Sequence, residues 1–170
     1  FYISDKGDVT IVISPLIALM KDQVNAILTD RGFKKAAYIN SEISLLDRDS
    51  IIEKCKAGEI DVLYMAPELL MSYDVRYFIG DRKIGLIVID EAHLITTWGR
   101  DFRVDYWYLG NQIRKIRKYS EQHFPMIAVT ATAVFGGDKN DMVFDTVDSL
   151  VMHSPHYFIG IVKRDDIEFI

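Results

Sequence analysis

Short runs of apolar and β-branched residues alternate along this chain with longer stretches in which apolar residues recur at helical spacing. The short runs predict strands at Thr10–Ile13, Ala36–Ile39, Val62–Met65, Ile84–Ile89 and Met126–Val129. Strands that alternate with helices pair in parallel, because each connecting helix carries the chain back across the sheet. The alternation therefore predicts an α/β fold, in which a parallel sheet has helices on both faces and forms a three-layer sandwich.

The longer stretches predict the helices of this fold. The first of them ends just before Gly32, where a glycine commonly terminates a helix. Helices are expected at Leu16–Asp30, Leu45–Ala57 and Asp105–Glu121, and Gly110 is a weak point in the last of these. A further helix is expected from Asp138 to about Met152, with late strands at Tyr157–Val162 and Ile167–Ile170.

Length and hydropathy limit how many domains the chain can form and whether it can span a membrane. With 170 residues, of which 49% are hydrophobic, the sequence has the size of one domain spanning residues 1–170. No apolar run approaches the roughly 20 residues of a membrane-spanning helix, and the first residues lack the basic region of a signal peptide. We therefore expect an intracellular protein with no membrane partner.

Net charge and cysteine content argue against a strongly basic protein and against one held together by disulfides or by a cysteine-based metal site. The net charge of −5 argues against a global basic field, so any contact with DNA must be local. The basic series Arg114, Lys115, Arg117 and Lys118 is expected on the solvated face of its helix. A lone Cys55 can form no internal disulfide and no cysteine-based metal site, so we expect an inert thiol.

Polar residues stand where the predicted strands end. In an open parallel α/β sheet, ligands bind beyond the carboxyl ends of the strands. We therefore expect a functional site at this edge, built from Ser14-Pro15, Asn40-Ser41, Ala66-Pro67, Asp90-Glu91 and Thr130-Ala131-Thr132.

The acidic pair Asp90-Glu91 follows an almost unbroken apolar run, which is typical of a central strand. Asp90 is well placed to hold Mg²⁺, which prefers oxygen ligands, and Glu91 could deprotonate a water that attacks a phosphate. The alternative is that Asp90 caps the next turn and that Glu91 is an exposed acid near a helix N-terminus. His93, close behind the pair, favours the catalytic interpretation.

Three short motifs stand at Asp90-Glu91-Ala92-His93, at Ser14 to Val24 and at Trp98 to Arg103. They resemble motifs of the RecQ family of ATP-dependent DNA helicases. The first spells the Walker B box of superfamily 2 helicases, a DEAH box. The segment from Ser14 to Val24 is similar to RecQ motif Ia, and Trp98 to Arg103 resembles the aromatic-rich loop that follows the Walker B box in this family. Residues Tyr64 to Glu68 and Ala128 to Ala133 resemble two further motifs, the second being motif III. The resemblance implies the first RecA-like domain of such a helicase.

The resemblance also implies roles for individual residues. ATP and Mg²⁺ would be the cofactors, with Asp90 on the metal and with Asp90, Glu91 and His93 in the catalytic site. Thr130 and Thr132 would couple nucleotide state to closure against a second RecA-like domain, which is not part of this chain. Single-stranded and partially duplex DNA would contact Ser14, Pro15, Lys21, Gln23, Trp98, Phe102 and Arg103. Location would be the nucleoid or the nucleus, in DNA repair or recombination.

Each of these residues also has a simpler interpretation. Ser14 or Thr132 could merely satisfy turn amides, Lys21 could be solvated, and His93 could be structural. Trp98 and Phe102, four apart, could be core aromatics on a helical face. Gly99 and the surrounding charges favour instead a loop that stacks on bases and senses DNA.

One expected motif is missing from the 170 residues. No Gly-x-x-x-x-Gly-Lys-Ser/Thr loop is present, and Gly136-Gly137 lacks the lysine that would complete it. Truncation at the N-terminus explains this better than degeneration, so the isolated chain is expected to be inactive. The alternatives are a non-catalytic interaction module with a helicase-like fold and an RNA-directed DEAH-box motor, which the aromatic-rich loop disfavours.

Overall fold

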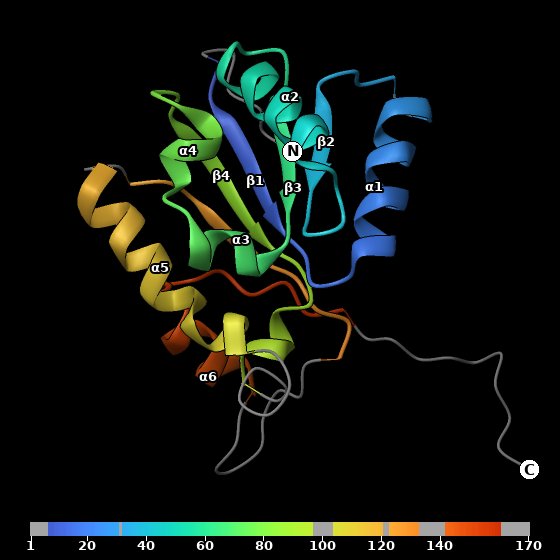
Figure 1. Cartoon of the computed structure of the whole chain (residues 1–170). Coiled ribbons are helices and arrows are strands. Elements are labelled where there is room, and N and C mark those ends of the chain that lie inside the picture. The colour runs from blue at the N-terminus through green and yellow to red at the C-terminus, as the bar shows by residue number, and fades with distance from the viewer. Residues whose placement is uncertain (1–6, 31, 97–103, 121–122, 133–141, 161–170) are drawn as a thin grey trace, which may run out of the picture.

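A single parallel sheet organises the computed structural model, which describes residues 7–30, 32–96, 104–120, 123–132 and 142–160. The sheet has five strands in the order β2-β3-β1-β4-β5 (Figure 1). Their bounds are Val9–Ile13 for β1, Ala36–Ile39 for β2, Val62–Met65 for β3, Ile84–Ile89 for β4 and Met126–Ala128 for β5. The predicted strands are confirmed at these positions, with differences of one residue at the start of β1 and the end of β5.

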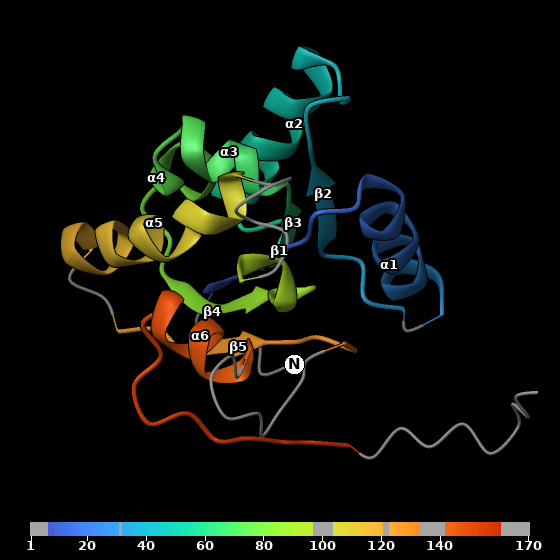
Figure 2. The ribbon, with the colours of Figure 1, turned by 90° about the horizontal axis from the view of Figure 1, so that it is seen from below.

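Helices cover the two faces of the sheet unequally. One helix, α1 (Ile17–Thr29), packs on one face through Met20 and Val24. The opposite face is covered by α2 (Leu45–Lys56), α3 (Pro67–Ser72), α4 (Val75–Ile79) and α5 (Val104–Ser120), as the view from below shows (Figure 2). The three-layer α/β prediction is therefore confirmed, with the larger core under the second set of helices.

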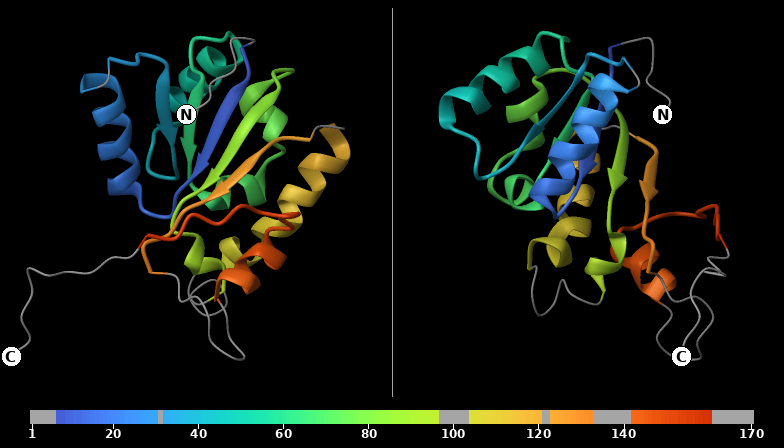
Figure 3. Two further views of the ribbon diagram at one scale, coloured as in Figure 1. Left: turned by 180° about the vertical axis from the view of Figure 1, so that it is seen from behind. Right: turned by 90° about the vertical axis from the view of Figure 1, so that its right-hand side faces the viewer.

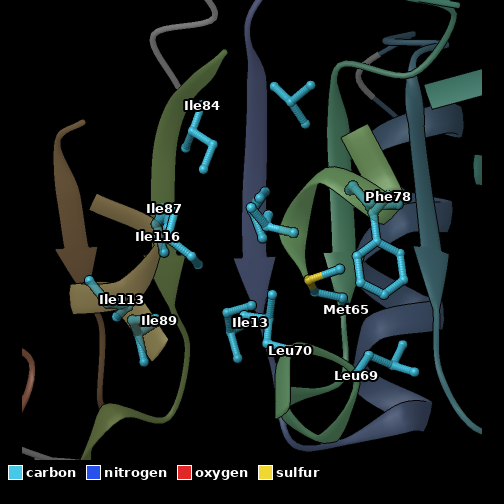
Figure 4. Close-up of a cluster of buried hydrophobic side chains, with 14 of the residues drawn as sticks. Ile13, Met65, Leu69, Leu70, Phe78, Ile84, Ile87, Ile89, Ile113 and Ile116 are labelled. Atoms are coloured by element: carbon cyan, nitrogen blue, oxygen red, sulfur yellow. The ribbon is translucent and has the colours of Figure 1, made fainter. Parts of the chain in front are cut away.

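Successive side chains of β1 point to opposite faces of the sheet, so this strand contributes to both hydrophobic cores. Ile11 and Ile13 belong to the larger core, whereas Val12 belongs to the core under α1. Figure 4 shows the larger core, where Ile13, Met65 and Ile89 of the sheet lie near Leu69, Leu70, Phe78, Ile113 and Ile116 of the helices. Because both faces are apolar, the central strands read as continuous hydrophobic runs.

Local sequence signals set several helix ends. The Ser44 side chain accepts a hydrogen bond from the Asp47 amide and begins α2, and Asp74 begins α4 by accepting from the Arg76 amide. Gly80 follows α4 with φ of 62°, a conformation that a side chain would strain. The predicted end of the first helix before Gly32 is confirmed, since α1 ends at Thr29.

A half-buried arginine joins the connections at the amino edge of the sheet, opposite the predicted site. Arg82 pairs with Asp61 at 2.6 Å, and both side chains are 11% exposed. Its guanidinium also donates to the carbonyls of Gly7, Cys55 and Ile60, at 2.9, 2.5 and 2.5 Å. The residues that precede β1 and β3 are thus tied to the turn before β4, an arrangement that sequence periodicity did not indicate.

The last part of the chain differs from the prediction. Residues 157–160 form no strand, so the described part of the predicted Tyr157–Val162 strand is wrong; residues 161–170, including the second predicted strand, lie outside the described range. The predicted final helix is confirmed in shorter form as α6 (Met142–Ser149), while its expected cap Asp138 is outside the described range. Helix α6 packs beside η1 (Ala92–Ile95), a 3₁₀ turn that follows β4 (Figure 3, left).

Gly110 has a packing role that its sequence context did not reveal. A β-carbon at this position in α5 would overlap the carbonyl oxygen of Ser149 at the end of α6. The glycine is buried, as is Leu150, which follows the carbonyl. Absence of a side chain therefore lets the two helices meet backbone to backbone.

In the described residues, none of the helices combines the length and the apolar character that crossing a bilayer requires.

Candidate active site

The predicted edge of the sheet brings three strand ends together. Strand β1 lies between β3 and β4, and β4 lies between β1 and β5. Ile89 of β4 is in register with Ile13 on one side and Ala128 on the other. The residues that follow these three positions therefore converge, although they are far apart in sequence.

Asp90 is the first residue beyond β4 and is half-buried. Its Oδ2 accepts a hydrogen bond from the Ser14 hydroxyl at 3.2 Å, and its Oδ1 accepts from the Glu91 amide at 3.0 Å. Burial raises the pKa of the nearby Tyr64 phenol, and the negative charge of Asp90 raises that pKa further. The carboxylate is thus oriented from two sides.

Glu91 has a left-handed backbone, with φ of 49° and ψ of 44°. This conformation costs a non-glycine residue about 1 kcal/mol or more, so surrounding contacts must hold it. The side chain, 28% exposed, places Oε2 3.2 Å from Nδ1 of His93. Unusual backbone geometry of this kind concentrates where a side chain must be aimed.

His93 joins the acidic turn to the end of β5. Its Nδ1 lies 3.0 Å from the Thr130 hydroxyl, in addition to its contact with Glu91. The Thr130 hydroxyl accepts a hydrogen bond from the Thr132 amide at 3.2 Å. A chain of polar contacts therefore runs from Glu91 through His93 to Thr130 and Thr132.

The structure brings six of the predicted site residues together in one network of polar contacts. They are Ser14, Asp90, Glu91, His93, Thr130 and Thr132. Ser14 is fully buried and Pro15 is also buried, while Lys21 is exposed and Gln23 is half-buried on α1. Trp98, Phe102 and Arg103 lie outside the described residues. The nucleic-acid roles of all these residues stay predictions.

Tyr106 is a site neighbour that sequence reasoning did not assign. It lies in the first turn of α5, is fully buried, and donates its phenol proton to the Asp90 carbonyl at 3.1 Å. In the sequence it follows the aromatic-rich stretch that resembles the RecQ loop, and no contact with the acidic turn was expected of it. A usable signal existed, since a buried phenol normally requires a hydrogen-bond partner.

The oxygen atoms at this edge suit a hard cation that takes most of its ligands from outside the protein. Asp90 offers carboxylate oxygens, and the Ser14 hydroxyl lies against them. In the part of the chain that the structure describes, no group of three or more His, Cys, Asp or Glu side chains could hold a metal. Mg²⁺ fits such a site, because it commonly binds through one or two carboxylates together with phosphates and water.

Solved structures with the same arrangement of elements are helicases. A DNA-bound structure of the DUF1998 helicase MrfA aligns over 86% of this chain and 20% of its own, with a TM-score of 0.62 and 20% identity. The Hef helicase domain of Pyrococcus furiosus aligns over 87% of this chain and 28% of its own, with a TM-score of 0.55 and 17% identity. At this level of identity the similarity shows the fold.

Sequence comparison gives closer relatives. The chain is 37% identical to the ATP-dependent DNA helicase RecQ of Pasteurella multocida, over 94% of this chain and 23% of that protein. It is 41% identical to the probable ATP-dependent DNA helicase RecS of Bacillus subtilis, over 92% of this chain and 29% of that protein. The chain thus spans less than a third of the length of these relatives.

The family profile described as DEAD/DEAH box helicase matches residues 2–136, which include β1 to β5 and every strand end of the candidate site. The RecQ-type relatives match over nearly the whole chain, in agreement with the motifs at Ser14 and Asp90. The chain therefore belongs to the DEAD/DEAH box helicase family, and it has RecQ-type homologues over nearly its whole length.

Proposed function

We propose that this chain forms most of the first RecA-like domain of a RecQ-type, ATP-dependent DNA helicase. In that parent protein it would couple ATP hydrolysis to movement along single-stranded DNA and to unwinding of duplex DNA. The observation that carries the proposal is the polar chain Asp90, Glu91, His93 and Thr130 at the carboxyl edge of the sheet. This edge is where an α/β sheet binds its ligand.

Glu91 is proposed as the general base of hydrolysis. A carboxylate acts in this way when it can accept the proton of a water positioned against the γ-phosphate. Asp90 would hold Mg²⁺, which neutralises phosphate charge when it is bound. The Ser14 and Glu91 hydrogen bonds to Asp90 support this assignment, because they leave the carboxylate fixed at the sheet edge.

His93, Thr130 and Thr132 are proposed to couple the site to its surroundings. They form a continuous path between the acidic turn after β4 and the end of β5. A second RecA-like domain of the parent would close on this edge, and DNA would contact Lys21, Gln23 and the loop from Trp98 to Arg103. The names of the RecQ relatives support DNA as the partner, and work on DNA would place the protein in the nucleoid or the nucleus.

The experiment compares the parent helicase with its Glu91→Gln variant. Wild type is expected to hydrolyse ATP with stimulation by single-stranded DNA. The variant is expected to bind ATP and Mg²⁺ with nearly unchanged affinity and to lose hydrolysis, since an amide keeps the shape of the side chain but cannot accept the proton.

Glu59→Gln provides a control, because Glu59 is exposed in the connection before β3, at the amino edge of the sheet and so at the opposite end from the acidic turn. Normal hydrolysis in the Glu91→Gln variant would remove Glu91 from the catalytic role. Binding of DNA without hydrolysis in wild type would favour a non-catalytic interaction module, and stimulation by RNA alone would favour an RNA-directed motor.

A further inference from the structure

The backbone of Asp90 and Glu91, including the peptide that joins them, is held from several directions. The Asp90 amide donates to the Ile13 carbonyl at 2.9 Å, and the Glu91 amide donates to the Asp90 side chain at 3.0 Å. The Glu91 carbonyl accepts from the Leu94 amide at 2.9 Å. The Asp90 carbonyl accepts from the Tyr106 phenol at 3.1 Å, which brings in a side chain from α5.

The conformation of Glu91 makes this last hydrogen bond important. Glu91 has a positive φ, which disfavours any residue with a β-carbon. A flip of the Asp90–Glu91 peptide changes ψ of Asp90 and φ of Glu91 together, and so would relieve the left-handed conformation. The same flip turns the Asp90 carbonyl away from its present direction. The hydrogen bond from Tyr106 therefore opposes the backbone motion that would release the strain at Glu91.

The position of Tyr106 makes this restraint stiff. The residue is fully buried, and its helix packs on both α3 and η1. Leu109 and Ile113, on the same face of α5, are also fully buried. The phenol therefore approaches the Asp90 carbonyl from a fixed direction, and a peptide flip would leave a buried hydroxyl without this partner.

We propose that Tyr106 is a positioning residue, which locks the Asp90–Glu91 peptide and thereby aims the Glu91 carboxylate. This inference rests on the proposed function of Glu91, because the aim of the side chain matters only where it acts on a reacting water. Tyr106 itself touches no reacting atom. It acts through the backbone of the acidic turn.

The first test is Tyr106→Phe in the parent helicase, with Tyr108→Phe as the control. Tyr108 lies in the same helix and is 48% exposed, so its substitution removes the same hydroxyl group from a ring outside the core. Tyr106→Phe is expected to lower kcat for DNA-stimulated ATP hydrolysis on the order of tenfold while KM for ATP changes little. Equal loss in the two variants, or a rise in KM with unchanged kcat, would overturn the inference.

A second readout needs no catalysis. Hydrogen–deuterium exchange, resolved on peptides that cover residues 90–96, measures how often the amides of Glu91 and Ala92 open. Tyr106→Phe is expected to speed exchange there and to leave β3 unchanged. If wild type proves to hydrolyse no ATP, the proposed function fails, while exchange still decides whether Tyr106 locks the turn. Unchanged exchange overturns the inference in either case.

Should Tyr106→Phe fail to fold, hydrogen–deuterium exchange in wild type alone still tests the lock. The amides of Glu91 and Ala92 are expected to exchange far more slowly than those of exposed turns, because the Asp90–Glu91 peptide is held by Tyr106. Fast exchange of these amides in the folded protein would contradict the positioning role.

Discussion

Nδ1 of His93 lies 3.0 Å from the hydroxyl of Thr130, which joins the turn after β4 to the end of β5. The same nitrogen lies 3.2 Å from Oε2 of Glu91. A neutral imidazole that is protonated at Nδ1 has a single N–H to direct at these two acceptors. In that tautomer Glu91 and Thr130 compete for the same N–H, and we expect a change in the contacts of Glu91 to be transmitted to the contact between His93 and Thr130.

Thr130→Val tests this transmission in the parent helicase. Valine keeps the branched shape and removes the hydroxyl, so the contacts with His93 and with the Thr132 amide are lost. We expect unwinding to fall several-fold more than DNA-stimulated ATP hydrolysis, measured on the same preparation. Thr29→Val, at the exposed end of α1, is the control. Parallel loss of both activities would assign Thr130 to hydrolysis itself.

Trp98→Ala and Phe102→Ala test the proposed DNA-sensing loop, which lies outside the described residues. Stacking of these rings on bases is expected to reorder the segment that follows Glu91. Each variant should therefore lose DNA-stimulated hydrolysis far more than DNA affinity or DNA-free hydrolysis. A collapse of thermal stability with normal stimulation would identify the rings as core residues, and a fall in affinity alone would leave them a binding platform.

Gly110→Ala should loosen the contact between α5 and the end of α6. The added methyl group would overlap the Ser149 carbonyl, and forcing atoms into a packed region costs about 1–3 kcal/mol. We expect a lower thermal midpoint and faster hydrogen exchange in α6. Gly160→Ala is the control, because a β-carbon there meets nothing within 4 Å. Equal stability of the two variants would mean that α6 can shift without cost.

The Cys55 thiol should be unreactive in the folded protein. Burial raises its pKa, an effect that the charge of Arg82 partly opposes. Alkylation, followed by mass spectrometry of the peptide that contains Cys55, should be slow at a pH near the ordinary thiol pKa of about 8.5 and fast in urea. Because the folded pKa is the higher one, this thiol's contribution to stability falls as the pH rises from the unfolded pKa through the folded pKa. Rapid alkylation without denaturant would contradict its burial.

The strands and long helices were predictable because hydrophobic periodicity reports burial directly. Ile84–Ile89 was recognisable as a central strand from its apolar run alone. The short helical elements α3, α4 and η1 were missed, since four to six residues make too few helical turns for a repeating apolar pattern to be recognised. Tyr157 stands in an apolar, β-branched context that indicated a strand, but no sheet partner accompanies residues 157–160 in the structure.

The candidate site was predictable as a set of strand ends but not as a set of contacts. Parallel topology brings Ser14, Asp90 and Thr130 to one edge whatever their sequence separation. The left-handed backbone of Glu91 and the approach of Tyr106 depend instead on how α5 packs, over a distance that no local pattern reports. Arg82 likewise binds the segment before β1, the end of α2 and the segment before β3, which are adjacent only after folding.

The central place of β1 has a consequence for synthesis of the chain on the ribosome. Val12 pairs with Tyr64 on one side and with Val88 on the other, so neither neighbour exists when β1 emerges. Once β3 has been made, the β4 side of β1 still presents an apolar edge, and it is closed only when translation has passed Ile89. Exposed strand edges of this kind attract other chains. The nascent protein is therefore most in need of a chaperone while residues between β3 and the end of β4 are being added.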